Sequence, residues 1–290
     1  MSNSVLEVRG LNKFYTNFQI KNLNLKLNAG EIIGFIGSNG AGKSTTIKSI
    51  LNIIDVDSGE ILFNGENIKS NEIDFKAQIG YVGENTRFYN DITLNSLYKF
   101  VKESYKNYWD DAYFKNLINS VFKLNMNKKI KELSKGMIVK YMLAIALSHN
   151  PKLLILDEPT SGLDPIIRQE VLNILWDLNK KNNTTIFMSS HISEDIESIC
   201  ERIIFIDAGK ILLDIKVKGA LEKYKKIEVD KLSSEQKRTF EKFSVASKEF
   251  YIFDMNDIDK NIESNLLREV SLNEILFYLN NKNLREVKND

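Results

Sequence analysis

Cysteine and long hydrophobic runs are both scarce in this sequence. Cys200 is the one cysteine among 290 residues, so the chain can form no internal disulfide and no cysteine-based metal site. A lone cysteine fits a reducing compartment, and we expect Cys200 to be a small buried side chain. No apolar run approaches the roughly 20 residues that a membrane helix needs, and the first residues do not resemble a secretory signal. We therefore expect a soluble chain whose membrane connection, if it has one, is made through a partner.

An excess of one sign of charge is also missing. The chain has 40 Lys and Arg residues against 39 Asp and Glu residues. No global basic field results, and we expect no nucleic-acid partner.

The stretch from Gly37 to Thr45 follows the pattern G-x-x-x-x-G-K-[ST] of a phosphate-binding loop. An apolar run at 31–36 precedes it, and apolar residues at helical spacing follow it at 46–51. A strand, a glycine turn and a helix start leave backbone N–H groups pointing at one spot, where the helix dipole favours an anion. In such a loop Lys43 would reach the terminal phosphates and the Ser44 hydroxyl would lie on Mg²⁺. The predicted nucleotide contacts are Ser38, Asn39, Gly40, Ala41, Gly42, Lys43, Ser44 and Thr45. A chance match is the alternative, which the flanking strand and helix disfavour.

Two consecutive acids, Asp157 and Glu158, follow the apolar run at 153–156. Asp157, at the end of a predicted strand, could reach Mg²⁺ or its water shell beside Ser44. Glu158 would point to the other face and could polarise an attacking water. Two solvated loop acids are the alternative, but that alternative does not explain why the preceding residues are uniformly apolar.

The rest of the pattern predicts an α/β chain. Apolar or alternating runs predict strands within 5–27 and at 31–36, 61–63, 79–82, 153–156, 184–188, 203–206 and 211–213. From 91 to 148 the apolar residues recur three and four apart, which predicts an inserted helical subdomain. We interpret 13–15 as an aromatic turn, 57–60 as a second turn, and Ser193 as part of a helix cap. Asp164 and Pro165 should begin a longer helix, and His149 should be a structural cation at a helix end.

The composition becomes more charged from about Lys216. Predicted strands at 227–229 and 250–253, and a capping box formed by Ser271 and Glu274, favour a small folded α+β appendage over a solvated tail. We therefore divide the chain into a domain at 1–215 and an accessory domain at 216–290. We expect the accessory domain to lie at a dimer interface or near a membrane partner, outside the catalytic centre.

Taken in order, these motifs resemble the ATP-binding cassette of ABC transporters, from Val5 to about Asp214. Residues 37–45 look like its Walker A motif, 153–158 its Walker B motif, 133–137 its signature and 161–164 its D-loop. His191 matches the switch histidine. Tyr15 matches the aromatic residue on which adenine stacks, with Phe14 as the alternative. The resemblance implies a P-loop NTPase core with an antiparallel β-subdomain and a helical subdomain, using ATP and Mg²⁺.

The resemblance also implies a mechanism and partners. Two cassettes, identical or different, would close head to tail around two ATP molecules, so Ser134, Lys135 and Gly136 would act in trans, with Asp164 in the D-loop. Lys43 would take up phosphate charge, Glu158 would orient the water and His191 would contact the γ-phosphate. A separate transmembrane subunit would hold the chain at the cytoplasmic face of the membrane.

Two positions depart from the family pattern. Lys135 and Met137 replace residues of the usual Leu-Ser-Gly-Gly-Gln signature, while Ser134 and Gly136 remain, so we expect phosphate binding to survive. Glu84 stands where the family has glutamine. Its carboxylate could ligate Mg²⁺ or water, but its charge would change the coupling to the membrane partner.

We predict the ATPase subunit of a membrane exporter, similar to bacterial cassettes that export antimicrobial or amphipathic peptides. The alternative is a soluble ABC-type ATPase acting on ribosomes or DNA. A single cassette, a single cysteine and a short insert favour the exporter. The substrate and the direction of transport stay open at this point.

Overall fold

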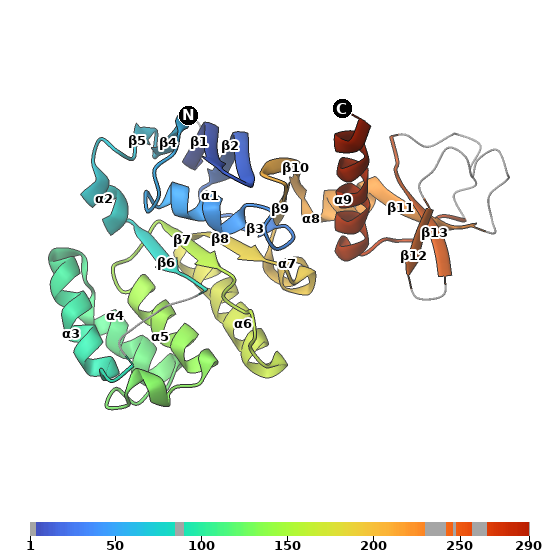
Figure 1. Ribbon diagram of the computed structural model, residues 1–290. Helices are drawn as coiled ribbons and strands as arrows, with labels where there is room; N and C mark the ends of the chain where they lie inside the picture. Colours follow the sequence, from blue (N-terminus) through green and yellow to red (C-terminus); the bar gives the residue numbers. More distant parts are fainter. Residues whose placement is uncertain (1–3, 85–89, 230–241, 246–247, 257–265, 290) are drawn as a thin grey trace.

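The computed structural model describes residues 4–84, 90–229, 242–245, 248–256 and 266–289 (Figure 1). The alternating residues at the start of the chain form a hairpin of β1 (Ser4–Tyr15) and β2 (Phe18–Asn28). Its apolar residues are buried on one face. With β4 (Ser58–Phe63) and β5 (Glu66–Asn67) the hairpin forms an antiparallel sheet of order β2-β1-β4-β5. This sheet is the predicted antiparallel layer.

Both predicted turns in this layer were misplaced. Tyr15 pairs with Phe18, so 13–15 end β1 and the turn lies at 16–17. Ser58 pairs with Asn12 and begins β4. In both places the residues favour a turn by their local sequence, but they pair with a neighbouring strand and are therefore part of the sheet.

The central sheet has the order β10-β9-β3-β8-β7-β6. The P-loop follows β3, so it lies at the middle of this sheet. Its members are β3 (Ile32–Ile36), β6 (Ile79–Val82), β7 (Leu153–Asp157), β8 (Thr185–Ser190), β9 (Arg202–Asp207) and β10 (Lys210–Lys216). The strands from β9 to β6 are parallel, and β10 is antiparallel to β9. Parallel strands buried on both faces read as continuous apolar runs, which explains why these strands were predictable.

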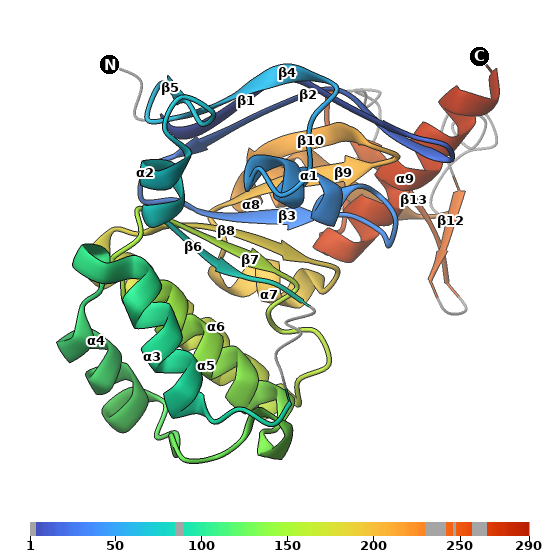
Figure 2. The same ribbon diagram turned by 60° about the vertical axis from the view of Figure 1, so that its left-hand side comes forward.

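The insertion between β6 and β7 is helical, as predicted. It contains α3 (Leu94–Tyr105), a short 3-10 turn (Lys106–Tyr108), α4 (Asp111–Asn116), a π-helical turn (Leu117–Val121), a second 3-10 turn (Ile130–Glu132) and α5 (Lys135–Leu147). Figure 2 shows these helices on the side of the central sheet away from the β1–β2–β4 layer.

Helices cover the faces of the central sheet. α1 (Lys43–Ile50) lies between the two sheets, and α2 (Glu72–Ala77) precedes β6 (Figure 2). α6 (Pro165–Asn182) begins at the predicted cap, where the Asp164 carboxylate accepts hydrogen bonds from the Ile166 and Ile167 N–H groups at 3.2 and 3.1 Å. α7 (Ser193–Ile199) has acids in its first turn as predicted, but its N-cap is Ile192, without a side-chain cap. The prediction that Ser193 caps this helix was therefore wrong by one residue.

The C-terminal part contains α8 (Val217–Lys223), β11 (Tyr224–Glu228), β12 (Lys242–Val245), β13 (Lys248–Asp254) and α9 (Leu272–Asn289). The strands form a sheet of order β11-β13-β12. The predicted capping box is present: Ser271 N donates to Glu274 Oε2 at 2.8 Å, and Glu274 N donates to Ser271 Oγ at 3.3 Å. Leu272 N donates to Glu197 Oε1 at 2.9 Å, which fastens the start of α9 to α7.

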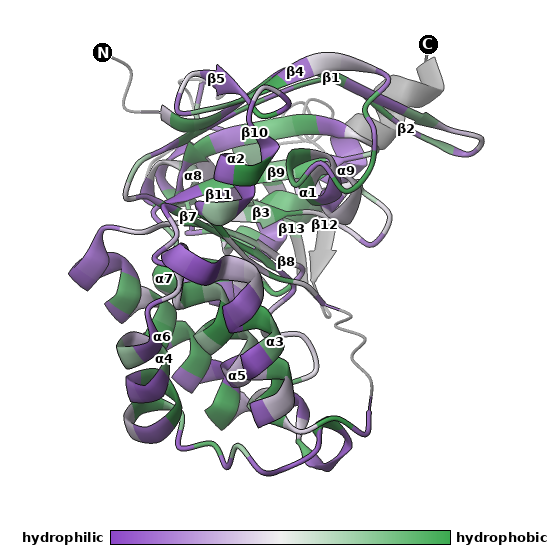
Figure 3. Ribbon diagram, turned by 90° about the vertical axis from the view of Figure 1, so that its left-hand side faces the viewer, coloured by the Kyte–Doolittle hydropathy of each residue, from purple (hydrophilic) through white to green (hydrophobic). Residues whose placement is uncertain are grey.

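Hydrophobic residues concentrate on the central strands and on the helix faces turned toward them (Figure 3). Cys200 is buried as predicted, and burial raises the pKa of its thiol, which stays protonated at neutral pH. None of the helices in the described part of the chain combines the length and the hydrophobicity that a membrane crossing requires.

Candidate functional site

The loop that joins β3 to α1 encloses one end of a pocket. Gly42 precedes α1 with φ of 112°, a left-handed conformation that glycine adopts readily. A Cβ atom at Gly42 would lie 2.9 Å from the Phe18 ring, so the close approach of this ring is a second reason for glycine at this position. Ala41 N donates to Ser38 O at 3.1 Å and closes the turn. The loop therefore has the strand–turn–helix form that its sequence predicts.

The pocket has a volume of about 770 Å³. It is lined by Asn17, Phe18, Ser38, Asn39, Gly40, Gly42, Lys43, Ser44, Thr45, Glu84, Glu158, Ser161 and His191. Residues far apart in the sequence thus meet at the end of the central sheet where β3, β7 and β8 terminate.

Lys43 lies at the floor of this pocket. Its Nζ donates to Gly37 O at 2.7 Å and lies 3.4 Å from Glu158 Oε1. Both side chains are more than nine-tenths buried. Because a buried charge is costly unless it is paired, the ammonium and the carboxylate stabilise each other. An incoming phosphate would offer Lys43 a competing anion.

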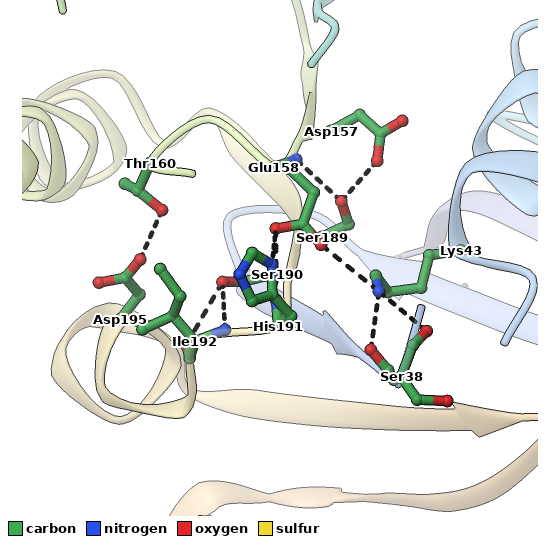
Figure 4. Close-up of polar contacts among 11 residues, drawn as sticks. Ser38, Lys43, Asp157, Glu158, Thr160, Ser189, Ser190, His191, Ile192 and Asp195 are labelled. Carbon is green, nitrogen blue, oxygen red and sulfur yellow. Dashed lines mark hydrogen bonds and ion pairs between the residues drawn. The ribbon is translucent and has the colours of Figure 1, made fainter. Parts of the chain in front are cut away.

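Glu158 also contacts His191. The ring Nδ1 lies 2.7 Å from Glu158 Oε2, and because an ionised carboxylate only accepts, Nδ1 is the donor (Figure 4). The His191 side chain is 46 % exposed, whereas Glu158 is 8 % exposed. Glu158 has φ of +54°, in the left-handed region that is rare outside glycine. The structure thus brings the three residues predicted as catalytic into contact around a single carboxylate.

Asp157 ends β7 and is 3 % exposed. Ser189 Oγ donates to its Oδ1 at 2.6 Å. Ser44 lines the pocket with a half-buried hydroxyl. Carboxylate and hydroxyl oxygens are the hard donors that Mg²⁺ takes together with phosphate oxygens and water, so the chemistry of these two side chains fits the ion. Ser44 is part of the described pocket lining, whereas Asp157 is not. Burial, with a smaller contribution from the charge of Asp157, raises the pKa of Tyr81 to about 12, which keeps this neighbouring phenol neutral.

Comparison with known proteins decides the family. Residues 20–161 match the family model described as ABC transporter. The ABC transporter ATP-binding protein YtrB of Bacillus subtilis (strain 168) is 34% identical over 226 residues, covering 78% of this chain and 76% of that protein. The chain belongs to the ABC transporter family. It is an ATP-binding subunit of the family, and an ATPase.

Other relatives agree with this assignment. The bacitracin transport ATP-binding protein BcrA of Bacillus licheniformis is 35% identical over 218 residues, covering 73% of this chain and 70% of that protein. The lantibiotic transport ATP-binding protein SrtF of Streptococcus pyogenes is 34% identical over 218 residues, covering 74% of this chain and 93% of that protein. A solved ATP-binding subunit of an ABC transporter superposes with a TM-score of 0.67 at 27% identity, covering 75% of this chain and 92% of that one. The predicted cassette fold, a P-loop core with β- and helical subdomains, is therefore confirmed.

The predicted adenine-stacking residue is outside the described lining of the cassette's pocket. Tyr15 is 49% exposed and is not among the described residues that line the pocket. Lys13 Nζ lies 5.4 Å from its ring centroid. Phe14, the alternative, is 51% exposed. Phe18, across the hairpin from Tyr15, does line the pocket, so the stacking role of Tyr15 stays a prediction.

The signature residues belong to another region of the cassette. Ser134 caps α5 by accepting from Met137 N at 3.3 Å, and its side chain and that of Lys135 are exposed. A Cβ at Gly162 would lie 2.9 Å from Lys135 Nζ, which places Lys135 beside the D-loop. The described lining of the pocket includes none of Ser134, Lys135 and Gly136. Asp164 is engaged as the α6 cap, and Glu84 lines the pocket with an exposed side chain.

Sequence reasoning missed a buried polar cluster behind the pocket. Asp195 on α7 is wholly buried and accepts hydrogen bonds from Thr160 Oγ1 and Arg168 Nε. Thr160 follows the two acids, and Arg168 lies on α6. The cluster ties the chain after Glu158 to the helix that follows His191 (Figure 4). The sequence shows only an acid next to the apolar Ile196, and nothing in that pattern points to Arg168, which lies 27 residues away.

The second histidine is structural, as predicted, but it is not the cation that the prediction assumed. His149 is 4% exposed, its Nε2 donates to Ile79 O at 3.0 Å, and its ring stacks on Tyr105 with 4.3 Å between centroids. Burial lowers the pKa of His149 below its ordinary value of 6.5. It is therefore neutral at neutral pH, and the expected favourable interaction of a cation with the helix dipole is wrong.

Proposed function

We propose that this ATPase powers export through a separate membrane subunit, and that antimicrobial peptides are its substrate class. The names of BcrA and SrtF, which contain bacitracin transport and lantibiotic transport, support the substrate class. By this proposal the chain lies at the cytoplasmic face of the membrane, held there by its partner.

The proposed roles of the site residues follow from their contacts. The Lys43 ammonium and the N–H groups of the loop at 38–45 bind the phosphates. Glu158 leaves Lys43 when phosphate arrives and orients a water molecule for attack. His191, already a donor to Glu158, contacts the γ-phosphate. Asp157 and Ser44 would hold Mg²⁺, whose charge would offset that of the phosphates, and Glu84, which lines the pocket, would offer a further carboxylate to the ion or to its water.

A second cassette completes the site in this proposal. Ser134, Lys135 and Gly136 lie at the N-terminus of α5, where helix N–H groups favour an anion. Because they are separate from the described pocket lining of their own chain, a head-to-tail partner would supply them to the nucleotide. Identical and different partner chains both satisfy this arrangement.

Residues 216–290 are proposed as an accessory domain attached to a catalytic domain at 1–215. Its own sheet and α9 support this division, although β10 runs to Lys216 and crosses the boundary. The bond from Leu272 N to Glu197 Oε1 joins α9 to α7, the helix that follows the switch histidine in the chain.

The observation that carries the proposed chemistry is the contact of Glu158 with both Lys43 and His191. Glu158→Gln should keep ATP binding and lower turnover about 10²- to 10⁴-fold, because the amide cannot accept the proton from water. Phosphate release and equilibrium ATP binding are measured on the same preparation. Turnover near the wild-type rate in Glu158→Gln would show that another group does this work.

Export is tested separately. The chain is co-purified with its membrane partner and reconstituted in vesicles, and ATPase activity and peptide uptake are measured with bacitracin and with a lantibiotic. The Glu158→Gln complex is the control. Peptide-stimulated hydrolysis with uptake supports the substrate class. Hydrolysis that no peptide stimulates would refute the substrate class and leave the ATPase assignment intact.

The alternative of a ribosome- or DNA-acting ATPase is not favoured. The relatives described above are named for transporters or for transport of peptides.

A further inference from the structure

Ser189 is a hydroxyl residue in the most buried part of the central sheet. It lies on β8, between β3 and β7, and is 0% exposed. The three residues before it, 186–188, are apolar and also fully buried. A hydroxyl is unfavourable in such surroundings unless hydrogen bonds satisfy it. Its contacts therefore indicate why a serine is tolerated there.

The Ser189 hydroxyl joins both acids that follow β7. Its Oγ donates to Asp157 Oδ1 at 2.6 Å and accepts from Glu158 N at 3.0 Å (Figure 4). Asp157 is also the parallel-strand neighbour of Ser189 in the sheet register. A single atom thus contacts the side chain of one acid and the backbone of the next.

Each of these bonds constrains a different part of the site. The bond to Oδ1 limits rotation of the Asp157 carboxylate. The bond from Glu158 N holds the backbone of a residue whose φ is +54°, a conformation that persists only where its surroundings enforce it. From this backbone the Glu158 side chain reaches Lys43 and His191.

We propose that Ser189 is a positioning residue that aligns Asp157 for the metal and Glu158 for the attacking water through one hydroxyl. The proposal rests on the roles proposed above for these two acids. The described hydrogen bonds of its hydroxyl go to these acids, so Ser189 acts through them.

The chain offers a matched control in the next residue. Ser190 is on the same strand and is also 0% exposed, but its Oγ accepts from Ile192 N at 2.9 Å and contacts neither acid. Ser190→Ala therefore removes a buried hydroxyl of the same kind without touching Asp157 or Glu158.

Ser189→Ala should weaken Mg²⁺ binding and lower kcat by about 10- to 100-fold, the range typical for groups that orient a metal ligand. Binding is measured by calorimetry, titrating Mg²⁺ into the full chain with a non-hydrolysable ATP analogue. ATP affinity in EDTA should stay at the wild-type value, since Lys43 and the loop are untouched. Ser190→Ala should leave Mg²⁺ affinity and kcat unchanged, and Ser189→Thr should restore part of both.

Equal Mg²⁺ affinity and kcat in Ser189→Ala and Ser190→Ala would overturn the proposal. If Ser189→Ala does not fold, Ser189→Cys and Ser190→Cys give the same comparison. Cysteine keeps the side-chain volume nearly constant and replaces the hydroxyl with a thiol, which is a weaker hydrogen-bond donor. Glu158→Gln and Asp157→Asn are measured alongside. If the two acid variants lose turnover and the Ser189 variant does not, only the positioning role of Ser189 is refuted. If both acid variants keep full turnover, the roles proposed for Asp157 and Glu158 are refuted as well.

Discussion

At the scale of single residues, the exposed ring of Tyr15, which pairs across the hairpin with the pocket-lining Phe18, is the predicted adenine contact. One ring in this position can stack on a base, and base–aromatic stacking is worth about 1–3 kcal/mol. Tyr15→Ala should therefore weaken ATP binding by about 1–3 kcal/mol, whereas Tyr15→Phe should keep the affinity. The measurement is a fluorescence titration with a labelled ATP analogue.

The neighbouring aromatic residues serve as controls for this prediction. Phe14 precedes Tyr15 on β1, and successive side chains of a strand point to opposite faces. If Tyr15 stacks on the base, Phe14→Ala should therefore not change the affinity. Phe18 packs toward Gly42, and Phe18→Ala tests the other side of the hairpin. A loss confined to the Phe14 or Phe18 variant would move the stacking role to that residue.

At the scale of elements, α7 is held to α6 by an ion pair whose two members differ in exposure. Asp195 is 0% exposed and Arg168 is 27% exposed. Removing Arg168 leaves a carboxylate buried without its cation, which typically costs about 3–5 kcal/mol. Removing the charge of Asp195 leaves a guanidinium that water can partly reach. The protein then loses only the stabilisation from one charged hydrogen bond, about 1–3 kcal/mol.

Arg168→Met should therefore destabilise the protein more than Asp195→Asn. Urea unfolding of the two variants and of the wild type measures the difference. Thr160→Val provides a third point, because it removes only the neutral donor to Asp195. A larger loss of unfolding free energy in Asp195→Asn than in Arg168→Met would contradict the argument that the more buried charge is the costlier one to leave unpaired.

At the scale of the whole molecule, His149 makes stability depend on pH. Burial lowers its pKa in the folded state below 6.5, so below pH 6.5 the unfolded chain binds a proton that the folded chain resists. The stability that neutral His149 contributes is present above pH 6.5 and is lost as the pH falls. The slope approaches about 1.4 kcal/mol per pH unit at most.

His149→Gln should flatten this dependence below pH 6.5. The free energy of unfolding is measured in urea for both proteins between about pH 5 and about pH 8, a range in which the unfolded wild-type chain can bind about one more proton at this site than the folded chain. Carboxyl groups titrate alike in the two proteins and cancel in the comparison. Identical slopes would show that His149 does not resist protonation in the folded state.

The sequence predicted the parts of the molecule that local patterns determine. The parallel strands, the inserted helices and the phosphate loop follow from apolar runs, helical spacing and glycine positions. Tyr15 and Ser193 were misplaced because pairing and capping decide element ends, which local preference indicates poorly. Asp195 and Arg168 lie 27 residues apart, and Ser189 meets Asp157 only once β8 lies beside β7. Contacts of this kind depend on strand order, which the sequence pattern does not contain.

The helical insertion is attached to the central sheet at two points of one strand pair. It leaves at Val82, the carboxyl end of β6, and returns at Leu153, the amino end of β7, which runs parallel beside it. The two attachments lie at opposite ends of this pair of neighbouring parallel strands, so the line that joins them roughly follows the strand direction. We therefore expect a force on the insertion to act as a torque about the strand direction, and β7 joins the point where the insertion returns to Asp157 at its far end.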